Sequence, residues 1–116
     1  MAEAEAVERR GSDRFNLFWT GVATKADGGA FNIRTDRISI DGGVFNSPQP
    51  LRNGEVLLLT FRIMVNGTAI GQKVVVKVIH TRILRDGLGY GVGFAFIRPS
   101  SKLIMLIERL SRRKAA

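Results

Sequence analysis

The sequence has no cysteine and a single histidine, His80, among its 116 residues. Without cysteine the chain forms no disulfide and offers no thiolate to a metal, which fits a reducing compartment such as the cytoplasm. One histidine is too few for a typical zinc site or a histidine-based proton relay. We therefore expect a cytoplasmic protein with no metal and no cofactor.

Long hydrophobic runs are also missing. No apolar stretch approaches the roughly 18 residues that cross a bilayer, and the N-terminus, Met-Ala-Glu-Ala-Glu-Ala-Val-Glu, lacks the apolar core of a signal peptide. We expect no membrane insertion. The length and the composition, 45% hydrophobic and 24% charged, are those of one globular domain.

Positive charge is in excess, with a formal net charge of +8, and this favours anionic partners. Some of the cations end the chain, where they complement the dipole of a helix C-terminus. Three others, Arg9, Arg10 and Arg14, lie in an N-terminal segment too polar for a core. A guanidinium group pairs bidentately with phosphate and with O6 and N7 of guanine. We therefore predict a flexible arm over residues 1–14 that helps to bind an anionic ligand.

The residues after the arm predict strands at 15–24, 30–40, 55–65, 69–84 and 90–97. The strand at 55–65 is the clearest, because every second residue is apolar: Leu57, Leu59, Phe61, Ile63 and Val65. Asn66-Gly67 then predicts a tight hairpin turn. In the strand that follows, Val74, Val76 and Val78 alternate with Lys73 and Lys77.

Only the end of the chain has a helical pattern. Ser100 or Ser101 can cap the helix, and the apolar residues that follow recur at helical spacing: Leu103, Leu106, Ile107 and Leu110. About six short strands followed by one helix indicate a mainly β fold. We predict a small six-stranded antiparallel β-barrel with a C-terminal α-helix, over residues 15–116.

A second polar motif, Ser39-Ile-Asp-Gly42-Gly43, lies at a predicted strand end. The hydroxyl of Ser39 can donate and accept, and glycines at 42 and 43 allow backbone N–H groups to approach a ligand closely.

With these two motifs the chain resembles the PilZ domain, the bacterial receptor module for cyclic di-GMP, over nearly its whole length. Arg10 and Arg14 match the Arg-x-x-x-Arg segment of that family, Ser39 and Gly42 match its Asp/Asn-x-Ser-x-x-Gly motif, and residues 91–96 resemble its closing strand. The resemblance implies that cyclic di-GMP binding switches the conformation of the arm and regulates motility, biofilm or exopolysaccharide output through a protein partner. Arg9, just before the arginine pair, implies a stacked pair of ligands.

The chain departs from the family motif at one position. Arg37 stands where Asp or Asn contacts a guanine edge in the family, and the nearest acid is Asp36, one residue earlier. Arginine cannot accept those hydrogen bonds, and a slip of one residue turns Asp36 to the other face of a strand. Either a local bulge returns Asp36 to the site or the affinity is weakened.

Three further side chains have a predicted environment. We expect Trp19 and Phe18 to pack in the core and the barrel wall. We expect His80 to share a strand face with Val78 and Arg82, as a partly buried, hydrogen-bonded histidine or as a residue that lines the site from the barrel wall.

We do not expect catalysis, but two functions other than nucleotide binding stay open. Ser39 lacks the Gly-x-Ser-x-Gly context of a nucleophile and no phosphate-binding loop is present, so we expect no enzyme. Arg37 favours a PilZ-like module that binds proteins instead of nucleotide. Lys73 and Lys77 favour a barrel that binds RNA or single-stranded DNA, but the aromatic residues of a stacking surface are scarce, so we do not expect nucleic acid as the partner.

Overall fold

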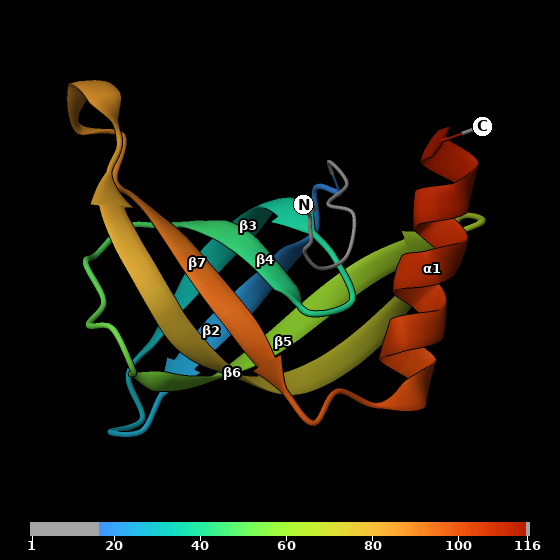
Figure 1. The fold of residues 1–116 in the computed structure, drawn as a ribbon, viewed down its shortest axis with the longest axis horizontal. Coiled ribbons are helices and arrows are strands. Elements are labelled where there is room, and N and C mark those ends of the chain that lie inside the picture. Colours follow the sequence, from blue (N-terminus) through green and yellow to red (C-terminus); the bar gives the residue numbers. More distant parts are fainter. Residues whose placement is uncertain (1–16, 116) are drawn as a thin grey trace, which may run out of the picture.

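The computed structural model describes residues 17–115, which form a closed antiparallel β-barrel and one α-helix (Figure 1). In chain order the elements are β2 (Thr20–Lys25), β3 (Ala30–Ile38), β4 (Gly42–Ser47), β5 (Val56–Val65), β6 (Thr68–Ile83), the 3₁₀ turn η1 (Arg85–Gly87), β7 (Tyr90–Ile97) and α1 (Ser101–Ala115). Around the barrel the strands follow the order β2-β3-β4-β7-β6-β5, and β5 pairs back onto β2. The predicted fold class is confirmed. Arg9, Arg10 and Arg14 of the predicted arm lie outside the described residues.

The β5–β6 hairpin follows the sequence pattern closely. All five predicted core residues of β5 are buried, and the three valines of β6 alternate with exposed lysines as expected. The two turn residues both have positive φ, 51° at Asn66 and 79° at Gly67. A two-residue turn with both φ angles positive matches the right-handed twist of the two strands that it joins.

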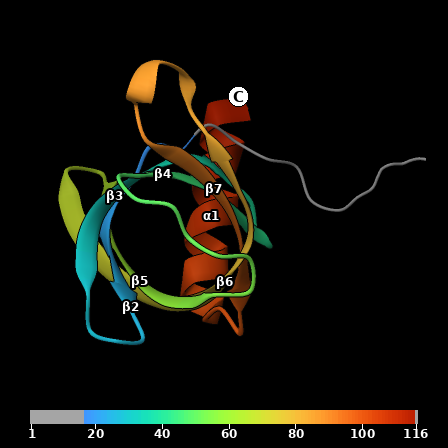
Figure 2. The ribbon, with the colours of Figure 1, turned by 90° about the vertical axis from the view of Figure 1, so that its left-hand side faces the viewer.

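Helix α1 covers one end of the barrel (Figure 2). It starts after Ser100, whose Oγ accepts a hydrogen bond of 3.1 Å from the N–H of Leu103. Leu103 and Ile107 are fully buried and belong to the same core as the inward side chains of the strands. At the other end of the barrel the β6–β7 hairpin projects beyond the remaining strands (Figure 1).

Strand β3 contains a bulge at Asp36. Its register against β4 shifts between Thr35 and Arg37, so Asp36 is an extra residue. Thr35 before the bulge and Ile38 after it are both buried. Asp36 and Arg37 therefore both lie on the outer face of the barrel, where strict alternation would have placed only one of them.

Strand β6 contains a second bulge, between Val78 and His80, with Ile79 as the extra residue. Val78 faces the core, whereas Ile79 and His80 are both exposed. The prediction that His80 shares a face with Val78 is therefore wrong, because the bulge moves His80 to the outside together with Arg82. His80 is exposed, so the predicted partly buried histidine is also wrong, and the alternative of a residue that lines the site from the barrel wall stays a prediction.

Strand β4 was not predicted, because its two leading glycines and the prolines beyond it indicate a loop. The glycines are required by packing: a Cβ on Gly42 would overlap the carbonyl oxygen of Phe94 in β7, and one on Gly43 would overlap that of Arg37 in β3. The two neighbouring strands thus approach β4 more closely than a side chain allows.

The first predicted strand begins later than expected, at Thr20. Trp19 is buried as predicted, with its ring in an edge-on contact with that of Phe61, 5.2 Å between centroids. Phe18 was expected in the core or wall but is 52% exposed, and the guanidinium of Arg34 lies 5.3 Å from its ring centroid.

Candidate ligand-binding site

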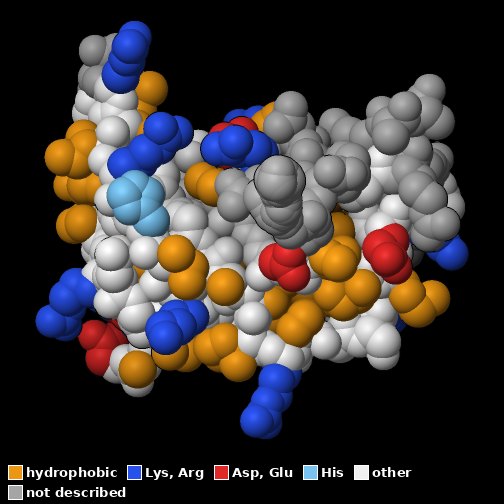
Figure 3. Space-filling model, viewed as in Figure 1, with side chains coloured by type: hydrophobic (Ala, Val, Ile, Leu, Met, Phe, Trp, Pro, Cys, Tyr) orange, Lys and Arg blue, Asp and Glu red, His pale blue; other side chains and the backbone are white. Residues whose placement is uncertain are grey.

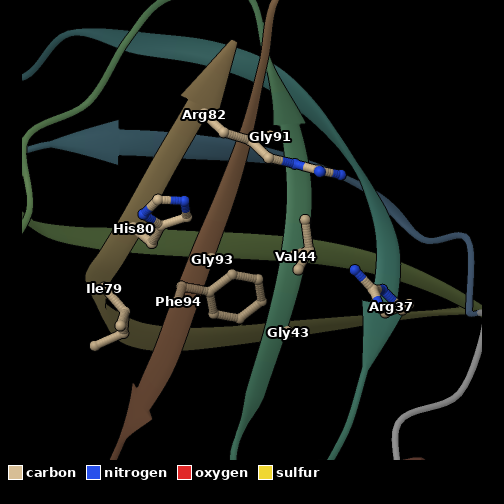
Figure 4. Close-up of a pocket in the computed structure, with 9 residues that line it drawn as sticks. All are labelled: Arg37, Gly43, Val44, Ile79, His80, Arg82, Gly91, Gly93 and Phe94. Atoms are coloured by element: carbon tan, nitrogen blue, oxygen red, sulfur yellow. The ribbon is translucent and has the colours of Figure 1, made fainter. Parts of the chain in front are cut away.

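A pocket of about 390 Å³ lies on the outer face of the barrel, across the four adjacent strands β3, β4, β7 and β6 (Figure 4). It is lined by Arg37, Gly43, Val44, Ile79, His80, Arg82, Gly91, Gly93 and Phe94. Its volume lies within the ~300–1,000 Å³ of typical small-molecule sites.

The floor of the pocket is made largely of glycine. Gly91 and Gly93 of β7 present backbone where other residues would project a side chain from the outer face, and Gly43 of β4 also lines the pocket. A Cβ on Gly91 would lie only 3.4 Å from Nε of Arg82, so the arginine side chain lies across the backbone of β7. The glycines of β7 therefore leave a hollow for the side chains of the neighbouring strands.

The walls of the pocket carry two arginines and a histidine. Arg37 lines it from β3, and His80 and Arg82 line it from β6. Figure 4 shows the two arginine side chains reaching toward β4 from opposite sides. The two bulges produce this arrangement, since they keep Arg37 and His80 on the outer face. None of the nine lining side chains is a carboxylate, so the pocket is suited to a ligand rich in acceptors and negative charge.

Ser39 and Gly42 form the tight turn between β3 and β4. The N–H of Ser39 donates to the carbonyl oxygen of Gly42 at 2.7 Å, and its Oγ accepts from the N–H of Asp41 at 3.2 Å. The same hydroxyl donates to the carbonyl oxygen of Gly42 at 3.3 Å. Ser39 is buried, so the structure gives its hydroxyl a role in holding the turn that starts β4.

Asp36 lies beside the pocket. It is half-buried on the outer face, adjacent in sequence to the lining residue Arg37. Of the residues predicted from the second motif, only Gly43 lines the pocket directly, while Asp36 borders it and Ser39 and Gly42 shape its edge.

The start of the described chain is tied to β3 next to the bulge. The N–H of Trp19 donates to Oγ1 of Thr35 at 2.7 Å, and that hydroxyl donates to the carbonyl oxygen of Leu17 at 2.6 Å. The described chain therefore begins close to the bulge that carries Asp36 and Arg37.

The three basic residues that line the pocket, Arg37, His80 and Arg82, were not among the predicted ligand-binding residues. In the sequence Arg82 has the pattern of one more outward residue of a long strand, and the pattern around His80 fits either a partly buried histidine or a wall residue. The signal that identifies His80 and Arg82 is the bulge at Ile79, which depends on the pairing of β6 with β7.

Within residues 17–115 no group of three metal-ligating side chains is found. No helix of the described chain is long and apolar enough to span a membrane.

Comparisons with known proteins agree with this architecture. The model of the PilZ domain family matches residues 8–113. Among solved structures, the Bacillus subtilis inhibitor of motility MotI/DgrA superposes with a TM-score of 0.81 at 12% identity, over 94% of this chain and 52% of that protein. The chain thus spans about half the length of MotI.

Two isolated PilZ domains are also similar. The PilZ domain of YcgR from Escherichia coli, solved with c-di-GMP, has a TM-score of 0.66 at 19% identity, over 93% of this chain and 98% of that domain. The PilZ domain of CeSA from a cellulose-synthesizing bacterium has a TM-score of 0.60 at 16% identity, over 90% of this chain and 100% of that domain. A search of curated proteins gives no match. Because the family model covers most of the sequence, the chain belongs to the PilZ domain family.

Proposed function

We propose that this chain is a receptor for cyclic di-GMP that passes ligand binding on to a protein controlling motility. The observation that carries the proposal is the pocket walled by Arg37, His80 and Arg82, beside the part of β3 to which the start of the described chain is tied. Two similar proteins support it: the PilZ domain of YcgR was solved with c-di-GMP, and MotI is an inhibitor of motility.

The ligand carries two phosphates and two guanines, and the pocket complements both. Arg82 and Arg37 supply guanidinium groups from the barrel, and Arg10 and Arg14 of the arm cover the ligand from the other side. These groups pair with phosphate oxygens or with O6 and N7 of guanine. Arranging the arm over the ligand costs conformational entropy, so binding and conformational change are linked. Arg9 then contacts the second member of a stacked ligand pair.

In this proposal Asp36 takes the role of the family's acidic residue. The bulge supports this assignment, because it keeps Asp36 on the same outer face as Arg37 despite the shift of one position. The carboxylate accepts hydrogen bonds from a guanine edge. Arg37 then adds a cation to the site. Gly42 and Gly43 hold β3 and β7 close to β4, and Ser39 fixes the turn between β3 and β4.

Arg37 also supports a second candidate, a PilZ module that contacts proteins without binding nucleotide. On that view the arginine removes the guanine contact of the family motif, and Asp36 does not replace it. The variant Arg37→Asp separates the two candidates: it restores strong cyclic di-GMP binding if the arginine alone caused the defect. In the receptor proposal the same variant weakens binding, because a cation of the wall is lost.

The direct test is a calorimetric titration of the full chain with cyclic di-GMP at physiological salt, with GTP as the control ligand. We expect selective, saturable binding, with a stoichiometry of two ligands per chain if Arg9 supports a stacked pair.

The double variant Arg10→Ala, Arg14→Ala should lose binding while its circular dichroism stays unchanged. The matched control Arg112→Ala, Arg113→Ala removes the same charge from the C-terminal helix and should bind normally. Equal binding by the arm variant would show that the site lies elsewhere.

A further inference from the structure

Strands β5, β6 and β7 contain no aspartate or glutamate at any position. The same three strands carry Arg62, Lys73, Lys77 and Arg82. They are neighbours in the barrel, so the charged side chains that these strands contribute to the outer surface are all basic. The exposed Asp41 lies at the border of this surface, where its carbonyl oxygen accepts from the N–H of Phe96 at 2.8 Å. Arg82 belongs to the ligand pocket, and the other three cations lie on the part of the surface that the pocket does not use.

The middle of this surface is an exposed apolar row. Leu58 of β5 pairs directly with Val75 of β6, and Val75 pairs directly with Ile97 of β7. These side chains are 36%, 40% and 37% exposed, and Val56, next to Leu58 on the outer side of β5, is 46% exposed. We call the surface made by Val56, Leu58, Lys73, Val75, Lys77 and Ile97 the β5–β7 face. Adjacent exposed aliphatic side chains of this kind mark interaction sites.

Lysines border the apolar row on both sides. Lys73 and Lys77 stand two residues before and after Val75 on the same strand, so all three project outward. In Figure 3 hydrophobic side chains lie over the lower part of the molecule, where β6 and β7 pass, and basic side chains project at its edge. The nearest carboxylate along β5 is Glu55, which already pairs with Lys25 at 3.6 Å and accepts from the N–H of Arg52 at 3.1 Å.

We propose that the β5–β7 face docks a protein partner whose contact surface is apolar at its centre and acidic around it. Charge complementarity identifies the occupant. A second copy using the same face would bring lysines against lysines, which disfavours a symmetric dimer. The outward residues of the face include no Trp, Tyr or Phe, the side chains that anchor proteins at a lipid interface or stack on bases.

This surface is separate from the ligand pocket, and its docking role does not depend on nucleotide binding. Strand β6 runs through both, with Val75 in the face and His80 and Arg82 in the pocket. Val75 and Lys77 are paired with β5 on one side and with β7 on the other, so at the centre of the face the partner contacts side chains and does not add a strand. The small number of exposed apolar side chains fits a transient contact, as expected of a signalling module.

The test uses the immobilised full chain and a phage-displayed library of random 16-residue peptides, with Val75→Asp as the counter-selection bait. Enriched peptides should combine Asp or Glu with Leu, Ile or Phe.

Synthetic versions of these peptides should bind the double variant Lys73→Glu, Lys77→Glu at least about tenfold more weakly than they bind the unchanged chain. The variant Leu58→Thr, Val75→Thr, which keeps the strand propensity of position 75, should show a similar loss. The control Lys102→Glu, Arg109→Glu makes the same charge change on exposed positions of α1 and should bind normally.

Several outcomes would overturn the proposal. The charge complementarity would be contradicted if the enriched peptides contained no acidic residues. It would also be contradicted if the peptides bound the α1 control as weakly as they bind the lysine variant. Failure to enrich any peptide against the counter-selection bait removes the docking role. A dimer in sedimentation velocity that Val75→Asp dissociates assigns the face to a second copy. Co-flotation with vesicles of anionic phospholipid that the lysine variant abolishes assigns it to lipid.

Discussion

Thr35 and Trp19 are joined by two hydrogen bonds: the N–H of Thr35 donates to the carbonyl oxygen of Trp19 at 2.8 Å, and the N–H of Trp19 donates to Oγ1 of Thr35 at 2.7 Å. The hydroxyl also donates to the carbonyl oxygen of Leu17. Thr35 is buried immediately before the Asp36 bulge. One side chain thus fixes both the entry of the chain into the barrel and the strand segment that borders the pocket.

Replacing this hydroxyl should cost stability. Thr35→Val keeps the shape but leaves the Trp19 N–H and the Leu17 carbonyl without their partner. Each buried polar group left without a partner costs ~1–3 kcal/mol, so for the two groups we expect a loss of about 2–6 kcal/mol in the free energy of unfolding. Urea unfolding monitored by the fluorescence of Trp19 measures it. Thr35→Ser, which keeps the hydroxyl, should lose much less; similar losses in both variants would show that the methyl group matters, not the hydrogen bonds.

The glycine at position 42 should tolerate no side chain. A Cβ there overlaps the backbone of Phe94, and strand backbone cannot move without disturbing the β4–β7 pairing. We expect Gly42→Ala to lower the free energy of unfolding by about 1–3 kcal/mol, the usual cost of overpacking. Gly71→Ala is the matched control, because a Cβ at Gly71 has nothing within 4 Å and the residue has no positive φ. Equal unfolding midpoints for the two variants would contradict this account of β4.

Local signals in the sequence were sufficient for the β5–β6 hairpin and for the helix. Alternation along β5 reflects one core face and one outer face, and Asn66-Gly67 has the backbone freedom that the turn requires. The cap at Ser100 and the apolar spacing of α1 are equally local. The pattern alone therefore predicted the two longest pieces of the fold.

The site depends on pairing between distant segments, which local patterns do not encode. The bulges at Asp36 and Ile79 arise from the registers of β3 on β4 and of β6 on β7. Strand β4 is a strand because its glycines fit between β3 and β7, although Gly-Gly by itself indicates a turn. The family motif located the β3–β4 turn, but the positions of His80 and Arg82 on the pocket wall became visible only with the register.

Asp36 should be a determinant of guanine selectivity. In the proposed site its carboxylate accepts from the guanine edge, so Asp36→Ala should weaken cyclic di-GMP binding about tenfold, the equivalent of one hydrogen bond. The preference over cyclic di-AMP should fall as well, because adenine lacks the donor pattern of guanine. Titration calorimetry with both dinucleotides measures this. Asp27→Ala, in the exposed β2–β3 turn, is the control; unchanged affinity and selectivity in Asp36→Ala would mean that the bulge does not restore the family contact.

Arg82 should contribute to affinity without contributing to stability. Its side chain lies over Gly91 on the pocket wall and is exposed, so Arg82→Ala should leave the unfolding midpoint almost unchanged. Losing a hydrogen bond to a charged group costs ~1.5–3 kcal/mol, so affinity for cyclic di-GMP should fall about 10- to 100-fold. Arg82→Lys keeps the charge but not the bidentate fork and should give an intermediate loss. Arg62→Ala, an exposed arginine on the outer side of β5, removes the same charge away from the pocket. If the Arg62 and Arg82 variants lost affinity equally, the effect would be long-range attraction and Arg82 would not contact the ligand.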